Sequence, residues 1–213
     1  MRWLADLLSP PACASCSAPL PDSNRVFCPV CAGTVERCPP SSDCLAFATY
    51  GGAMATAIRR FKYDDGAYLA RPLGGLLRGT CRAAGLSADL VVPVPLHPRR
   101  LATRGYNQSA LLAREIAAEL GALFAPRALC RVIDTAVQAE LSRAARQTNV
   151  RQAFRVTGKG AVHHSAIVLV DDVMTTGATL AACAAVLAEA GATRVTHVVL
   201  ARTLNDVSAD PSG

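Results

Sequence analysis

Two adjacent acids, Asp171 and Asp172, precede a run of small and hydroxylated residues in the stretch VLVDDVMTTGATL. Carboxylates repel phosphates, but they accept hydrogen bonds from vicinal hydroxyls such as those of a ribose ring. The residues that follow offer three hydroxyl donors around a glycine, and we call them the threonine loop: Thr175, Thr176, Gly177, Ala178 and Thr179. This loop leads into an expected helix, whose free backbone N–H groups favour an anion. A ligand with a ribose at one end and a 5′-phosphate at the other would suit both halves of the stretch.

The alternative for this stretch is purely structural, because Asp and Thr are common helix caps. Capping accounts for one such residue, but not for two acids and three threonines around a glycine. The stretch also lacks the G-x-x-x-x-G-K-[ST] pattern of a Walker A loop and the G-x-G-x-x-G pattern of dinucleotide-binding sites. The stretch therefore favours binding of a ribose phosphate, but not through either of these two glycine-rich motifs.

Basic residues form a second group with the chemistry of phosphate binding. The arginine cluster follows the apolar run DLVVPVP in an expected basic loop, and it consists of Arg99, Arg100 and Arg104. Guanidinium groups bind phosphates in a bidentate manner, so this cluster is expected to hold a pyrophosphate if the threonine loop holds a 5′-phosphate. The stretch ELSRAARQTNVRQAF suits a lid over the phosphates, with Arg143, Arg146 and Arg151 as its cations.

Cysteines form the third group, because six of the nine lie between Cys13 and Cys44. Two C-x2-C knuckles, CASC and CPVC, can together complete a tetrahedral zinc site with Zn–S bonds of about 2.3 Å. We expect a structural Zn²⁺ without an open position for chemistry, on the ligands Cys13, Cys16, Cys28 and Cys31. Buried or redox-active thiols are the alternative. Cys38 and Cys44 are spaced too loosely for a knuckle, and their role stays open.

The elements that must position these groups alternate between strands and helices. Apolar runs predict strands over 89–95, 166–170 and 194–201, and capped periodic stretches predict helices over 107–121 and 176–191. The strand over 166–170 shows no alternation, which indicates burial on both faces. The pattern predicts a parallel sheet flanked by helices, in which ligands bind at the carboxyl ends of the strands.

The composition is that of a globular chain with a basic middle. The chain has 213 residues, of which 51% are hydrophobic and 18% charged, and its net charge is +6. Residues 97–159 hold eleven Lys or Arg against four Asp or Glu, which indicates either a polyanion-binding surface or a solvated basic face. No apolar run reaches the roughly 18 residues of a membrane span, and the first eight residues do not fit a signal peptide. We expect a cytoplasmic protein.

We expect three parts along the chain. A cysteine-rich, zinc-binding segment occupies residues 1–45, the α/β domain occupies 46–205, and a disordered tail occupies 206–213.

The stretch VLVDDVMTTGATL resembles the phosphoribosyl pyrophosphate (PRPP) motif of type I phosphoribosyltransferases, in which apolar residues and two acids precede T-G-x-T. The resemblance implies that Asp171 and Asp172 bind the ribose hydroxyls and that the threonine loop binds the 5′-phosphate. In 6-oxopurine salvage enzymes the third residue after the acids is typically an Asp near the purine N7, whereas this chain has Thr175. This departure argues against hypoxanthine or guanine salvage and leaves the acceptor open.

Five features in this order resemble the ComF family: the knuckles, RRFKY, VPVPLHPRRLATRGYNQ, ELSRAARQTNVRQAF and VLVDDVMTTGATL. The resemblance extends from about Cys13 to Leu204. It implies a type I phosphoribosyltransferase-like domain with an N-terminal zinc-ribbon-like segment, and a role in natural competence, in which imported single-stranded DNA reaches the cytoplasm. Where many members carry a further C-x2-C, this chain has only Cys38 and Cys44.

Two functions follow as hypotheses. The first is a PRPP-binding phosphoribosyltransferase, with Mg²⁺ carried by PRPP because Mg²⁺ usually binds through substrate phosphates. No residue identifies itself as a general base. The alternative is a non-catalytic module that senses PRPP or a nucleotide and binds single-stranded DNA, with the competence machinery as partner. Aromatic residues are only 5% of the chain, which is few for a surface that stacks bases. Either function is compatible with an oligomer.

Overall fold

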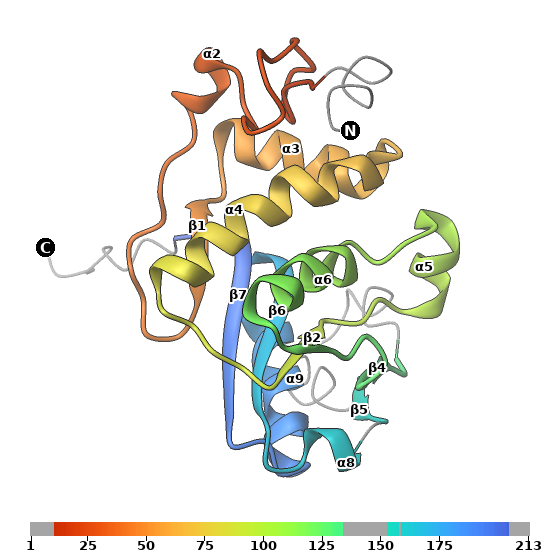
Figure 1. The fold of residues 1–213 in the computed structure, drawn as a ribbon. Coiled ribbons are helices and arrows are strands. Elements are labelled where there is room, and N and C mark those ends of the chain that lie inside the picture. The colour runs from red at the N-terminus through yellow and green to blue at the C-terminus, as the bar shows by residue number, and fades with distance from the viewer. Residues whose placement is uncertain (1–10, 134–152, 158, 205–213) are drawn as a thin grey trace, which may run out of the picture.

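The computed structural model describes residues 11–133, 153–157 and 159–204 (Figure 1). At its centre is a five-stranded sheet in the order β1-β7-β6-β2-β3, and every pair of neighbouring strands is parallel. The strands are β1 (Leu45–Thr49), β2 (Leu90–Pro93), β3 (Leu123–Phe124), β6 (Ala166–Met174) and β7 (Arg194–Arg202). The predicted parallel α/β sheet is confirmed. The expected lid arginines (Arg143, Arg146 and Arg151) and the expected tail (206–213) lie outside the described residues.

Both faces of the sheet are covered. One apolar core lies between the sheet and three helices, which are α3 (Gly52–Tyr63), α4 (Ala70–Ala83) and α6 (Gln108–Leu120). The second core lies under α9 (Ala178–Glu189) and the antiparallel pair of β4 (Leu129–Arg131) and β5 (Phe154–Val156). Because side chains alternate along a strand, Val168 and Val170 of β6 enter the first core while Ile167 and Leu169 enter the second. This double burial explains the missing alternation in the sequence.

Strand β6 is longer than predicted. It does not end at Val170 but continues to Met174, so both acids lie within the strand. The extension follows from pairing with β7, in which Asp171 lies opposite Val199 and Met174 opposite Arg202. Helix α9 begins at Ala178 rather than Thr176, because Gly177 takes a left-handed conformation with φ +76° before the helix. The acids are therefore held by the sheet and not by a loop.

The arginine cluster also lies in regular structure. We predicted a basic loop, but Pro98–Arg104 forms the short helix α5. Pro98 suits the first helical position, the His97 side chain accepts from the backbone N–H of Arg99, and Gly105 ends the helix with φ +80°. The remaining short elements are α2 (Pro29–Ala32), the 3-10 turn η1 (Gly66–Leu69) and α8 (Lys159–Val162).

The cysteine-rich segment runs along the outer edge of β1. Arg37 pairs with Ala48 in an isolated antiparallel bridge, and the carbonyl oxygen of Glu36 accepts from the backbone N–H of Thr49 at 2.9 Å. The Arg37 guanidinium lies 4.0 Å from the centre of the Phe47 ring. Part of the free edge of the sheet is thereby covered.

Candidate functional site

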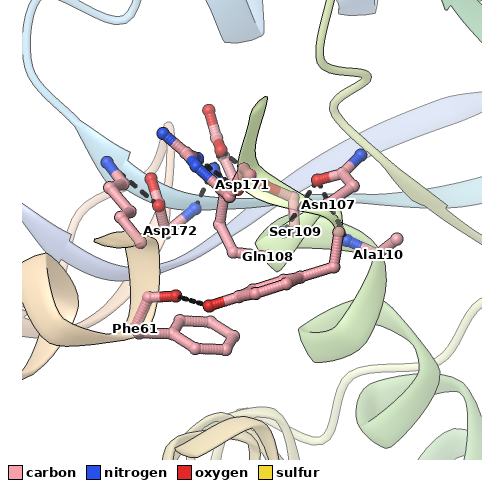
Figure 2. Close-up of polar contacts among 10 residues, drawn as sticks. Phe61, Asn107, Gln108, Ser109, Ala110, Asp171 and Asp172 are labelled. Carbon is pink, nitrogen blue, oxygen red and sulfur yellow. Dashed lines mark hydrogen bonds and ion pairs between the residues drawn. The ribbon is translucent and has the colours of Figure 1, made fainter. Parts of the chain in front are cut away.

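The two acids, which we call the acid pair, lie near the carboxyl end of β6 and face different neighbours (Figure 2). The Asp171 Oδ1 atom accepts from the Ser109 hydroxyl at 2.8 Å and from the backbone N–H of Asp172 at 2.9 Å. Asp172 is only 3% exposed, and its Oδ2 atom lies 3.0 Å from the Lys62 Nζ atom. Helix α6 thus contributes a partner to one acid and helix α3 a partner to the other.

Ionisation of the Asp171 carboxyl group is unfavourable in this position. Burial and then the adjacent Asp172 carboxylate raise its pKa to about 7, and the Ser109 hydrogen bond offsets only part of that rise. Asp172 has the Lys62 ammonium nearby, but among the described residues no donor is aligned for a hydrogen bond with its Oδ2 atom. A ligand that brings hydroxyl donors or a cation would stabilise both carboxylates.

The threonine loop connects the end of β6 to the start of α9. Thr175 and Thr176 are exposed, and the Thr176 hydroxyl oxygen accepts from the backbone N–H of Ala178 at 3.4 Å. Gly177 has a backbone conformation that disfavours other residues, and a Cβ atom there would lie 3.3 Å from the Met174 side chain. The loop therefore presents open hydroxyls at the N-terminus of a helix of 12 residues, which is a favourable place for a phosphate.

The arginine cluster borders a pocket of about 580 Å³, which we call the basic pocket. Its walls come from α3, from α5 and from the residues just after each helix, and they consist of Lys62, Tyr63, Asp65, Arg99, Arg100, Thr103, Arg104 and Tyr106. The Arg104 guanidinium donates to the Gln108 side-chain oxygen at 2.6 Å and lies 5.0 Å from the centre of the Tyr63 ring. Lys62 belongs both to this pocket and to the Asp172 ion pair. The basic pocket and the acid pair are thus neighbours.

Two residues at this site had no predicted role. Lys62 lies in the RRFKY stretch, one of the five features that resemble the ComF family, and that resemblance was the available signal. Ser109 and its neighbour Gln108 are buried polar residues directly after the helix cap Asn107, whose side chain accepts from two backbone N–H groups. Tyr106 packs against Phe61, and its hydroxyl donates to the Phe61 carbonyl. Tyr106 therefore has a structural role in packing against α3.

The four predicted zinc ligands lie together. The Sγ atoms of Cys13, Cys16, Cys28 and Cys31 all lie within 4.8 Å of one another, and those of Cys16 and Cys28 are 3.7 Å apart. Tetrahedral zinc with Zn–S bonds of about 2.3 Å places its sulfurs about 3.8 Å apart, so the donor set fits the ion. Cys38 and Cys44 are not members of this four-cysteine cluster.

The thiols of the cluster differ in acidity. Burial raises the pKa of Cys13, but backbone hydrogen bonds from Cys16, Cys28 and Ser15 outweigh it and lower the pKa to about 6. The pKa of Cys31 is raised to about 12, by burial and by the neighbouring thiols. The Cys13 thiol therefore ionises more readily than the Cys31 thiol, and four thiolates at this separation need a cation.

None of the helices within the described ranges combines the length and the apolar character that crossing a membrane requires.

The parallel sheet, the acid pair and the threonine loop define the class of the main domain. Residues 107–211 match the family model of the phosphoribosyl transferase domain, so the chain contains a domain of that type. Over nearly its whole length, the chain belongs to the family of the DNA utilization protein YhgH and competence protein F, which is the ComF family that the motifs resembled.

Three relatives illustrate this membership. DNA utilization protein YhgH of Salmonella typhimurium is 33% identical over 228 residues, which cover 93% of this chain and 100% of that protein. YhgH of Escherichia coli K12 is 33% identical over 197 residues, with coverage of 90% and 84%. Competence protein F of Haemophilus influenzae is 29% identical over 198 residues, with coverage of 90% and 85%. The chain thus matches these relatives over most of their length.

The sequence identity to solved structures is lower than the identity to these relatives. The glutamine PRPP amidotransferase of Bacillus subtilis gives a TM-score of 0.45 at 24% identity, over 62% of this chain and 26% of that chain. A purine phosphoribosyltransferase of Pyrococcus horikoshii gives 0.37 at 15% identity, over 64% and 84%. Nothing about the substrate follows from similarities of this size.

Proposed function

We propose that the protein binds PRPP near the carboxyl end of β6 and acts in the cytoplasm as a Mg²⁺-dependent phosphoribosyltransferase, for an acceptor other than hypoxanthine or guanine. We link this activity to the use of imported DNA, as the printed names of the relatives suggest. The observation that carries the proposal is the arrangement around β6. Two residues separate the acid pair from the threonine loop, which leads into α9, and Lys62 joins the acid pair to the basic pocket.

Each part of PRPP has a complementary group in this proposal. The ribose hydroxyls donate to the acid pair, in which the Asp172 Oδ2 atom has no hydrogen bond from the described residues. The 5′-phosphate accepts from the threonine loop and the free N–H groups of α9. The pyrophosphate enters the basic pocket, where the arginine cluster and Lys62 surround it. The ligand therefore spans three elements that β6 and α3 connect.

The reaction would be a displacement at the anomeric carbon of the ribose. The acceptor forms a bond to this carbon, the bond to the pyrophosphate oxygen breaks, and the electron pair leaves with pyrophosphate. Positive charge then builds on the sugar near the acid pair and negative charge near the arginine cluster, and both charges are stabilised by fixed opposite charges. Mg²⁺, when bound, would neutralise part of the pyrophosphate charge.

A PRPP titration by calorimetry, with and without Mg²⁺, tests the binding. We expect saturable binding that is stronger with Mg²⁺, and an absence of binding under both conditions would refute the proposal. Release of pyrophosphate in the presence of a panel of nucleobases then tests the transfer reaction. Turnover with any base would establish catalysis, and turnover with hypoxanthine or guanine would contradict the proposed acceptor.

The four-cysteine cluster would hold one structural zinc ion. Four thiolates fill a tetrahedral site, so the ion would order the segment and supply no catalytic chemistry. Metal analysis of the purified protein, with an expected content near one zinc per chain, checks this assignment.

A second candidate function is a PRPP or nucleotide sensor that binds single-stranded DNA without catalysis. The observation in its favour is Tyr63, which is 68% exposed although it lines the basic pocket. An exposed ring beside several cations is the combination that stacks bases and holds a nucleic-acid backbone. Salt-sensitive binding of a labelled single strand, weakened in Tyr63→Ala and accompanied by no turnover, would favour this function.

A further inference from the structure

The cysteine-rich segment holds helix α3 at both ends. At the N-terminal end, the Thr34 hydroxyl donates to the Cys31 carbonyl at 2.9 Å and accepts from the backbone N–H of Ala53 at 3.0 Å. At the C-terminal end, the Arg60 Nη1 atom lies within 3.3 Å of three successive carbonyl oxygens, those of Cys13, Ala14 and Ser15. One knuckle of the four-cysteine cluster is thus connected to each end of the helix.

The last turn of α3 also reaches the proposed ligand site. Lys62, two residues after Arg60, forms the ion pair with Asp172 and lines the basic pocket. The Phe61 carbonyl accepts from the Tyr106 hydroxyl, and Tyr63 lies under the Arg104 guanidinium. The Cys13–Cys16 knuckle and the ligand site therefore contact the same helical turn.

We propose that Thr34 and Arg60 are positioning residues that couple the four-cysteine cluster to the PRPP site through α3, so that zinc binding raises the affinity for PRPP. This inference rests on the proposed function. Zinc would fix the backbone around both knuckles, and that backbone supplies the carbonyls that Thr34 and Arg60 bind. A fixed α3 keeps the Lys62 ammonium between Asp172 and the basic pocket. Without zinc, the carbonyls move and Lys62 loses its fixed position.

The coupling can be measured as a change in PRPP affinity. We expect removal of zinc by a chelator to weaken the binding of PRPP with Mg²⁺ by about tenfold in the wild type, within the usual range of coupling between sites. The variant R60A should bind PRPP about tenfold more weakly even with zinc, and removal of zinc should then have little further effect. Calorimetry on the full chain gives all four affinities.

Arg59 provides the matched control. It is the preceding residue of α3, it is exposed, and it has no hydrogen bond or ion pair within the described part of the chain. The variant R59A removes the same charge and should behave as the wild type. The coupling would be refuted by equal PRPP affinities of R60A and R59A with zinc, or by equal effects of zinc removal on R60A and the wild type. Thermal melting of every variant confirms that it is folded.

A measurement without PRPP separates this inference from the proposed function. Hydrogen exchange of residues 60–66 and 171–174 should accelerate when zinc is removed, and to a similar extent in zinc-loaded R60A and T34A but not in R59A. Unchanged exchange would overturn the coupling even if PRPP binds. If the wild type does not bind PRPP at all, the proposed function fails, and the exchange result alone decides whether α3 connects the two sites.

Discussion

Asp171 lies beside a second carboxylate, and burial together with that neighbour raises its pKa to about 7. A carboxyl group whose pKa is higher in the folded than in the unfolded chain binds extra protons when folded. Its contribution to stability is therefore greatest below the unfolded pKa of 3.8, and it is lost as the pH rises through about 7. The same property makes Asp171 a strong hydrogen-bond acceptor once it is charged. Ionised Asp171 thus favours ligand binding but lowers the stability of the folded chain.

The variant D171N tests this conflict. An amide cannot ionise. At pH 8 the free energy of unfolding of the variant should therefore be about 1–2 kcal/mol higher than that of the wild type, and this difference should disappear near pH 4. Urea denaturation at both pH values gives the comparison. A difference that does not depend on pH would contradict the role of ionisation.

The double variant D171N/D172N tests the ribose assignment. Replacing both carboxylates removes the acceptors for the ribose hydroxyls, so PRPP binding should fall below detection in calorimetry while circular dichroism shows a folded chain. The variant S109A, which removes only one of the two donors to Asp171, should reduce the affinity far less. Unchanged affinity in the double variant would exclude the acid pair from the ribose site.

At the scale of elements, the connection from β6 to α9 depends on one backbone conformation. Gly177 has φ +76°, a region that costs residues with a Cβ atom about 1 kcal/mol, and its Cβ would also press on Met174. We expect G177A to destabilise the chain by about 1–2 kcal/mol and to weaken PRPP binding, because the threonine loop must shift.

Gly79 is the matched control for G177A. It lies in α4, and a Cβ added there would meet no atom within 4 Å, so G79A should stabilise the chain by about 0.5–1 kcal/mol through helix propensity. Urea denaturation of both variants measures the contrast. Equal effects would show that the Gly177 conformation is not required.

The sequence predicts the strongly patterned elements and misses those that depend on contacts. The apolar run before the acids and the capped helix of 107–121 are local signals, and both elements form. The extension of β6 through Asp171 is not predictable from propensity, since Asp is disfavoured in strands and only pairing with β7 keeps it there. Helix α5 is too short to show periodicity. Lys62 and Ser109 reach the acid pair from remote parts of the chain, so their roles depend on the fold.

At the scale of the whole molecule, the cysteine-rich segment and the sheet share one apolar core. Ala14 belongs to the same buried cluster as Met54 and Phe61 of α3, and Val26 and Phe27 pack against it. Zinc removal should therefore lower the melting temperature of the entire chain, by about 5 °C or more.

Calorimetric melting with and without a chelator measures that effect. The variant C16S should reproduce it, because Cys16 is one of the four clustered thiols. The variant C130S, which changes a cysteine outside the cluster, should melt as the wild type. Equal melting of the metal-free and the metal-loaded protein would contradict a structural zinc.

The bridge between Arg37 and Ala48 has one more consequence, which concerns self-association. Strand β1 is an edge strand, and an uncovered edge offers unpaired N–H and C=O groups to another chain. The bridge and the Glu36–Thr49 hydrogen bond occupy part of that edge. If zinc loss loosens the cysteine-rich segment, the edge becomes available for pairing between molecules. Dimers or aggregates that form only in chelator would then reflect an exposed strand and not a native assembly.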